Sequence, residues 1–97
     1  MRIIAKKPLR VFWERHADAE QALKAWYHDA KQANWKSPSD IRQTYVTASV
    51  LANNRVVFNI RGNSYRLIVA INYDFGVVYI RFIGTHQEYN RVDAETI

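Results

Sequence analysis

Residues 55–85 read RVVFNIRGNSYRLIVAINYDFGVVYIRFIGT, and this stretch decides the fold because its apolar residues recur at alternate positions. Two turn signals, Gly62-Asn63 and Asp74-Phe75-Gly76, divide the stretch into three runs. Glycine and asparagine tolerate the positive φ that a tight hairpin requires. The pattern therefore predicts three antiparallel strands, over residues 55–61, 64–73 and 77–85, joined as a meander.

The N-terminal third of the chain has a helical period instead. Pro8 suits the first turn of a helix, where its missing N–H removes no hydrogen bond. An apolar stripe at i, i+3, i+4 and i+7 follows it, formed by Leu9, Phe12, Trp13 and His16. Asp18 and Gln21 have the spacing of a capping box, which predicts the start of a second helix that ends near Asn34.

Two shorter elements complete the prediction: a first strand over residues 1–5, and a helical turn with Ser37 as N-cap and Pro38 at N1. One face of the predicted meander is uniformly apolar, and the two amphipathic helices can cover it. We therefore predict an α+β fold in which N-terminal helices pack on one face of a small antiparallel sheet. A chain of 97 residues without repeats or linkers predicts a single domain, residues 1–97.

The composition narrows the classes of function. The chain has no cysteine, which excludes disulfides, thiolate nucleophiles and cysteine-ligated zinc, and favours the cytoplasm as its compartment. No stretch approaches the roughly 18 apolar residues of a membrane span, and the first apolar run is too short for a signal peptide. Fourteen Lys and Arg against nine Asp and Glu give a net charge of +5, which favours nucleic acid or an acidic protein as partner.

The second face of the predicted meander is polar and basic. Alternation places these side chains on it, with no carboxylate among them: Arg55, Asn59, Arg61, Arg66, Asn72, Tyr79 and Arg81. Guanidinium groups bind phosphate oxygens in pairs, so this face is suited to hold RNA and to stabilise charge on a phosphoryl group. A solvated face that uses arginine for solubility and edge protection would have the same pattern.

Catalysis also requires groups that transfer protons, and residues 81–90, RFIGTHQEYN, supply them. His86 is the strongest candidate because imidazole titrates near neutral pH, and Glu88 and Tyr89 lie close to it in the chain. Strict alternation, however, places His86 on the core face. We expect a bulge at Gly84 to turn His86 toward the arginines, since a glycine within a strand commonly marks a bulge.

The sequence predicts no metal site and no cofactor. The three histidines are dispersed and lack the spacing of a ligand set. Gly62, Gly76 and Gly84 are isolated, so they form no phosphate-binding loop, and the GxSxG frame of a serine hydrolase is missing.

Two segments, VFNIRGNSYRLIVAINY and VYIRFIGTHQEYNRVD, resemble the HigB toxins of bacterial toxin–antitoxin modules, within the wider RelE-like group. The most specific parts are the hairpin leading into Tyr65-Arg66-Leu67 and the Gly84-Thr85-His86 ending with Glu88-Tyr89 after it. The resemblance covers most of the chain. It implies a RelE-like fold and an endoribonuclease that cuts mRNA during translation on the ribosome. It also implies a helix-turn-helix antitoxin, HigA, that neutralises the toxin and, with it, binds operator DNA to repress their operon.

The resemblance further implies a reaction without metal, in which the RNA 2′-hydroxyl loses its proton, attacks the adjacent phosphate in line and displaces the 5′-oxygen. The candidate catalytic residues are Arg66, Arg81, His86 and Tyr89. The candidate RNA-binding residues are Arg55, Asn59, Arg61 and Asn63. The arginines would hold the scissile phosphate, His86 and Tyr89 would transfer protons, and the asparagines would orient the nucleotide.

Two other functions are compatible with the sequence. A non-catalytic RNA-binding or ribosome-surface module would use the same basic sheet but would not need proton-transfer groups beside it. A protein that binds an acidic partner would need only the basic charge balance. The general acid and base are not resolved among His86, Glu88 and Tyr89, and the antitoxin has two alternatives: direct blockage of the arginine site or binding to the helices.

Overall fold

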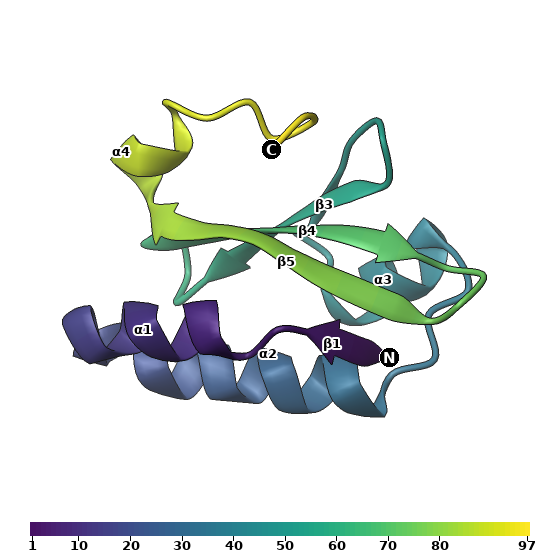
Figure 1. The fold of residues 1–97 in the computed structure, drawn as a ribbon, viewed down its shortest axis with the longest axis horizontal. Coiled ribbons are helices and arrows are strands. Elements are labelled where there is room, and N and C mark those ends of the chain that lie inside the picture. Colours follow the sequence, from purple (N-terminus) through teal and green to yellow (C-terminus); the bar gives the residue numbers. More distant parts are fainter.

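The computed structural model describes residues 1–97 and has the predicted α+β fold (Figure 1). Its elements are β1 (Arg2–Ile4), α1 (Lys7–Arg15), a 3₁₀ helix (Ala17–Ala19), α2 (Glu20–Gln32), α3 (Pro38–Thr44), β2 (Ser49–Val50), β3 (Arg55–Ile60), β4 (Tyr65–Asn72), β5 (Val77–Thr85) and α4 (His86–Tyr89). The predicted meander corresponds to β3, β4 and β5, and the three predicted helices correspond to α1, α2 and α3.

The sheet has five strands in the order β1-β5-β4-β3-β2. The meander pairs are antiparallel, as predicted. β1, however, lies parallel to the first part of β5, with Arg2 opposite Val77 and Ile4 opposite Tyr79. The sheet is therefore mixed: the α+β fold is confirmed, and the predicted antiparallel pairing holds for the meander but not for β1. Alternation within one strand identifies its buried face but not the neighbour it pairs with.

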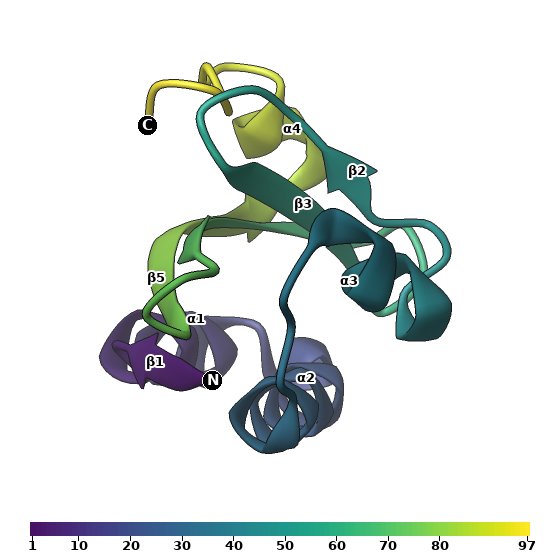
Figure 2. The same ribbon diagram turned by 90° about the vertical axis from the view of Figure 1, so that its right-hand side faces the viewer.

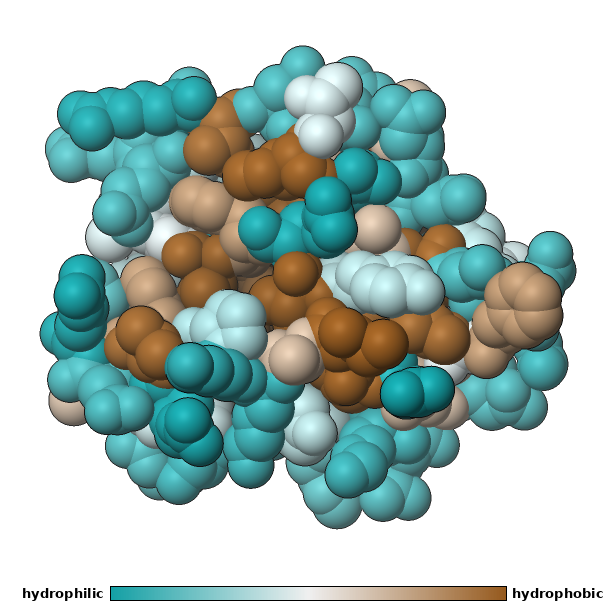
Figure 3. Space-filling view, viewed as in Figure 1, coloured by the Kyte–Doolittle hydropathy of each residue, from teal (hydrophilic) through white to brown (hydrophobic).

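Helices α1 and α2 lie side by side beneath one face of the sheet, and the main core fills the space between these layers (Figures 1 and 2). The indole of Trp26 on α2 meets the ring of Phe58 on β3 edge to face, with centroids 5.4 Å apart. Leu9, Leu23 and Leu67 are completely buried around them. In Figure 3, apolar side chains form a band across the middle of the molecule, between polar upper and lower surfaces. No helix has the length and apolar character needed to cross a membrane.

The second helix starts differently from the prediction. Asp18 lies in the 3₁₀ helix, and no side chain caps the N-terminus of α2. The carboxylate of Asp18 instead accepts a hydrogen bond from the Tyr65 hydroxyl and pairs with Arg61. A capping-box pattern in sequence cannot reveal a competing partner that is distant along the chain, and here the tertiary partners determine where this carboxylate points.

The other face of the sheet is partly covered rather than open. The segment after α4 crosses it, and Ala94 packs with Val57 and Ile68 in a second, smaller cluster. Partly buried apolar side chains complete that cluster: Leu51, Phe82, Tyr89, Val92 and Ile97. In Figure 1 this yellow segment runs above the sheet, on the side opposite α1 and α2.

A bulge in β5 changes which side chains reach each face. The pairing with β4 shifts between Ile68, which lies opposite Phe82, and Val69, which lies opposite Ile80. Arg81 is therefore the extra residue on β5. Phe82 joins the second cluster with Ile68 instead of the helix-side core. The predicted bulge exists, but its expected position at Gly84 was wrong.

Candidate active site

Arg66 lies near the start of β4, at the centre of the candidate site. Its neighbours across the sheet are Asn59 on β3 and Gly84 on β5. The guanidinium Nη1 donates to the main-chain oxygens of Asn63, at 3.0 Å, and Tyr65, at 3.3 Å. These bonds fix the half-buried side chain at the hairpin end of the sheet, and the remaining guanidinium N–H groups stay available for a ligand.

Tyr89 faces this guanidinium from α4. The Cζ atom of Arg66 lies 5.9 Å from the centroid of the Tyr89 ring, within the range of a cation–π contact. The tyrosine is half-buried because its ring also packs against the second cluster. The structure thus brings two of the four predicted catalytic residues together, and it brings the predicted RNA-binding residues Asn59 and Asn63 beside them.

A capping box determines where α4 begins, and with it the position of Tyr89. The Thr85 hydroxyl accepts from the Glu88 N–H at 3.2 Å, and the Thr85 N–H donates to the Glu88 carboxylate at 2.8 Å. That main-chain hydrogen bond, with smaller contributions from the Thr85 hydroxyl, His16 and Arg91, holds the pKa of Glu88 below its usual value. Glu88 is thus an ionised structural cap, which makes it less suited than His86 or Tyr89 to transfer protons.

His86 is the first residue of α4 and is exposed to solvent. It makes no side-chain hydrogen bond or ion pair, so its imidazole is free to approach a substrate at this end of the sheet. Strict alternation along the strand would have placed His86 toward the core. Alternation does not extend to His86, because the chain leaves the sheet after Thr85. His86 is kept out of the core by the helix start, whereas the sequence suggested a bulge.

Gly84 has a different role from the predicted one. A Cβ at this position would lie 2.5 Å from the Phe82 Cζ and 2.9 Å from the Glu88 Oε1. Both distances are shorter than non-bonded atoms allow. Only glycine lets the Phe82 ring and the capping carboxylate approach the strand together, and its small size also leaves room opposite Arg66.

The other three arginines do not converge on Arg66. Arg55 donates to the main-chain oxygen of Ile97 from Nε, at 3.1 Å, and from Nη2, at 2.7 Å. Arg81 donates to the same oxygen from Nε at 3.1 Å. Arg61 lies in the turn after β3, with a positive φ of 52°, and its Nη1 is 3.3 Å from the Asp18 carboxylate. The prediction that Arg61 shares an acid-free face with the others was wrong, because β3 ends one residue before it.

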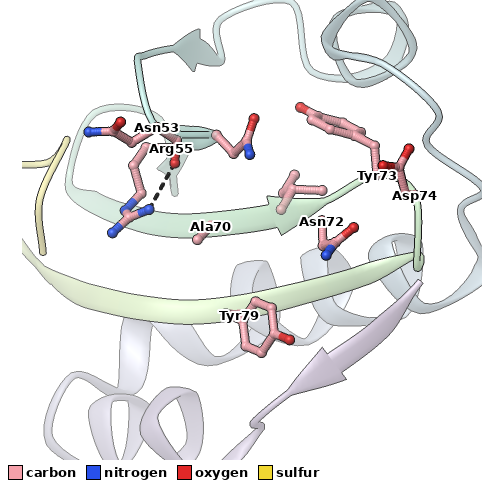
Figure 4. Close-up of a pocket in the computed structure, with 9 residues that line it drawn as sticks. Asn53, Arg55, Ala70, Asn72, Tyr73, Asp74 and Tyr79 are labelled. Atoms are coloured by element: carbon pink, nitrogen blue, oxygen red, sulfur yellow. Dashed lines mark hydrogen bonds between the residues drawn. The ribbon is translucent and has the colours of Figure 1, made fainter.

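The remaining polar residues of the predicted face, Asn72 and Tyr79, lie at the far end of the sheet. They line an open depression of about 430 Å³ together with Asn53, Arg55 and Tyr73 (Figure 4). Arg55 Nη1 donates to the Asn53 oxygen there at 2.8 Å, and the Asn72 side chain accepts from the Phe75 N–H. The depression also contains Asp74, so it is less favourable for a phosphate than the surroundings of Arg66.

Two features that shape the site were not predicted from the sequence: the capping role of Thr85 and the C-terminal segment over the sheet. The T-x-x-E spacing of Thr85 and Glu88 is a capping-box signal that was present in the sequence. By the same alternation, Val57 and Ile68 fall on the arginine face, and apolar residues there are a sign that another segment covers it.

With the geometry established, comparison with known proteins gives the class. Residues 19–92 match the model of the HigB toxin family, described as the RelE-like toxic component of a toxin-antitoxin system. The chain therefore belongs to the HigB toxin family. Over 94 residues it is 24% identical to the mRNA interferase HigB of Escherichia coli O6:H1, covering 95% of this chain and 91% of that protein. It is also 24% identical over 92 residues to the mRNA interferase toxin HigB of Escherichia coli K12, covering 93% of this chain and 88% of that protein.

Proposed function

We propose that this toxin is an endoribonuclease that cuts mRNA on the ribosome and thereby stops translation and growth. Membership of the HigB family and similarity to proteins named mRNA interferases support this function. The observation on the molecule itself that carries the proposal is the Arg66–Tyr89 pair, which combines an anion-binding group with a proton-transfer group at an accessible end of the sheet.

In the proposed reaction, Arg66 holds the scissile phosphate and offsets the negative charge that develops on it. A base removes the proton of the 2′-hydroxyl, the 2′-oxygen attacks phosphorus, and the 5′-oxygen leaves after it receives a proton. The products are a 2′,3′-cyclic phosphate and a 5′-hydroxyl. His86 and Tyr89 are the proposed proton-transfer groups, and no metal takes part.

The other candidate residues have supporting roles in this proposal. Asn59 and Asn63 flank Arg66 and orient the nucleotide. Arg81 uses only Nε for Ile97, so both of its Nη groups can contact RNA. Arg55 and Arg61 are engaged by Ile97 and Asp18, so they contribute less to binding unless RNA displaces those partners.

The proposal includes the partners that family membership suggests. A cognate antitoxin, HigA, neutralises the toxin, and the complex represses its own operon through the helix-turn-helix of the antitoxin. The protein acts in the cytoplasm, where mRNA is translated.

Expression of variants without antitoxin tests this function. The wild-type chain should arrest growth, and Arg66→Ala, Arg81→Ala, His86→Ala and Tyr89→Phe should each relieve the arrest to a measurable degree. Arg42→Ala, an exposed arginine on α3, is the matched control and should remain toxic. If all four site variants arrest growth as strongly as the control does, the active site lies elsewhere.

The alternative of a non-catalytic RNA-binding module predicts a different result. In that case wild-type protein binds RNA or ribosomes but leaves mRNA intact. A nuclease instead loses cleavage in the Tyr89→Phe variant while its salt-sensitive RNA binding persists.

A further inference from the structure

The outer edge of β5 has a strand beside it along only part of its length. β1 pairs with Val77–Tyr79 and ends there, whereas β5 continues to Thr85. β4 occupies the inner edge, so residues 80–85 have no strand on their outer side. An unpaired edge presents main-chain N–H and C=O groups that can receive another strand. The Thr85 N–H already donates to the Glu88 carboxylate, so the edge that can receive a strand ends at Gly84.

A groove of about 490 Å³ runs between this edge and α1. Its apolar lining comes from Pro8, Val11 and Phe12 on α1 and from Ile83 on β5. Val11 is 43% exposed and lies outside the buried stripe of α1, which is formed by Leu9, Phe12 and Trp13, so it is an apolar side chain that the core does not cover. Exposed apolar side chains that gather in a groove commonly mark a site where another molecule binds.

The charges around the groove select the kind of partner. Lys7 and Arg15 line it, together with His16, and neither of these two cations is in an ion pair. The one acid in the lining is Glu88, whose carboxylate is occupied by the capping box. An RNA backbone would use the cations but not the apolar floor, so the combination favours a protein segment with both apolar and acidic side chains.

We propose that the groove binds an extended, acidic segment of a partner protein, which adds to the sheet as a strand along the outer edge of residues 80–84. Alternate side chains of the segment are apolar and contact Val11 and Ile83, while its carboxylates pair with Lys7 and Arg15. This binding requires no nuclease activity, so it stands or falls separately from the proposed function.

Titration of the ¹⁵N-labelled protein with two synthetic peptides tests the inference. The acidic peptide acetyl-EVEIEVE-amide should shift the amide resonances of residues 80–84 and Val11 saturably, and salt should weaken its binding. The basic peptide acetyl-KVKIKVK-amide should not bind the groove. If the acidic peptide causes no saturable shifts up to millimolar concentration, or if both peptides bind equally, the proposal is wrong.

Substitutions give a second measurement. Val11→Asp should weaken binding of the acidic peptide by about tenfold or more, because a carboxylate is then desolvated within an apolar groove. Val46→Asp is the matched control, since Val46 is a 78% exposed valine before β2 and should have no effect. Reversing the charges with Lys7→Glu and Arg15→Glu should make the groove bind the basic peptide more tightly than the acidic one. Equal effects of the two valine variants, or an unchanged preference after charge reversal, would overturn the proposal.

Discussion

At the scale of single residues, the four arginines show how local structure separates side chains of one chemistry. Alternation predicted a common face for Arg55, Arg61, Arg66 and Arg81. Arg66 meets Tyr89, Arg55 and Arg81 share the main-chain oxygen of Ile97, and Arg61 pairs with Asp18. Only Arg66 combines a fixed position with free donors beside a proton-transfer candidate.

Gly84 gives a stability prediction at this scale. Gly84→Ala would push a Cβ against the Phe82 ring and the Glu88 carboxylate, both of which are held by packing or capping. We expect the free energy of unfolding to fall by about 1–3 kcal/mol, the usual range for overpacking. Urea denaturation measures this loss, and adding Phe82→Leu should recover part of it by removing the nearest ring atoms. An alanine variant as stable as wild type would show that the close approach is not a constraint.

The capping carboxylate gives a pH prediction. The lowered pKa of Glu88 means that the folded state favours the ionised form. Its stabilising contribution is therefore complete above the pKa that glutamate has in the unfolded chain, and it disappears as the pH falls through the folded pKa. Glu88→Gln should be less stable than wild type at neutral pH, and the difference should shrink on acidification. Glu14→Gln, an exposed carboxylate of α1 that caps nothing, is the control, and a pH-independent difference for Glu88→Gln would contradict the cap assignment.

At the scale of elements, the sequence predicted the helices and the meander because a period of two or of 3.6 is a local property of the chain. The parallel pairing of β1 and the bulge at Arg81 depend on residues far apart, so alternation could not reveal them. For the same reason, the sequence could not give the positions of the candidate site residues. Tyr89 and His86 were predicted as proton-transfer groups from their chemistry, and this role stays a prediction, whereas their positions follow from a helix that starts at the end of β5.

The bulge gives a prediction about β5. Deleting Arg81 should leave a continuous ladder, since Phe82 would then follow Ile80 opposite Ile68. That variant should fold with the remaining β4–β5 pairs unchanged. Deleting Ile83 should instead place Gly84 opposite Leu67 and remove an apolar side chain from the core. Cross-strand NOEs distinguish these cases, and an unfolded Arg81 deletion beside a folded Ile83 deletion would contradict the assigned bulge.

At the scale of the whole molecule, the sheet lies between two covers of unequal size. Helices α1 and α2 pack over one face with the larger core, while the segment around Ala94 covers the other face with a cluster of three buried residues. This partial cover leaves the Arg66 end and the depression at Asn72 as separate accessible regions. The sequence predicted one continuous basic face, and the apolar residues Val57 and Ile68 explain why it is divided.

Ala94→Asp tests this second cover. Ala94 is only 9% exposed, so the new carboxylate would be buried without a partner and the segment should detach. The expected loss in unfolding free energy is about 1–3 kcal/mol, and hydrogen exchange over β3 should accelerate. Ala17→Asp, at an exposed alanine of the 3₁₀ helix, is the matched control and should change neither quantity. Equal protection of β3 in both variants would show that the segment does not cover the sheet.

The proposed active site of Arg66 and Tyr89 is tested by mRNA cleavage in a reconstituted translation reaction. Wild type and the Arg42→Ala control should both produce fragments with 2′,3′-cyclic phosphate ends. Arg66→Ala should cut about 10²–10³-fold more slowly, as expected when one donor to a developing oxyanion is removed. Cleavage by Arg66→Ala at the rate of the Arg42→Ala control would contradict the proposed active site.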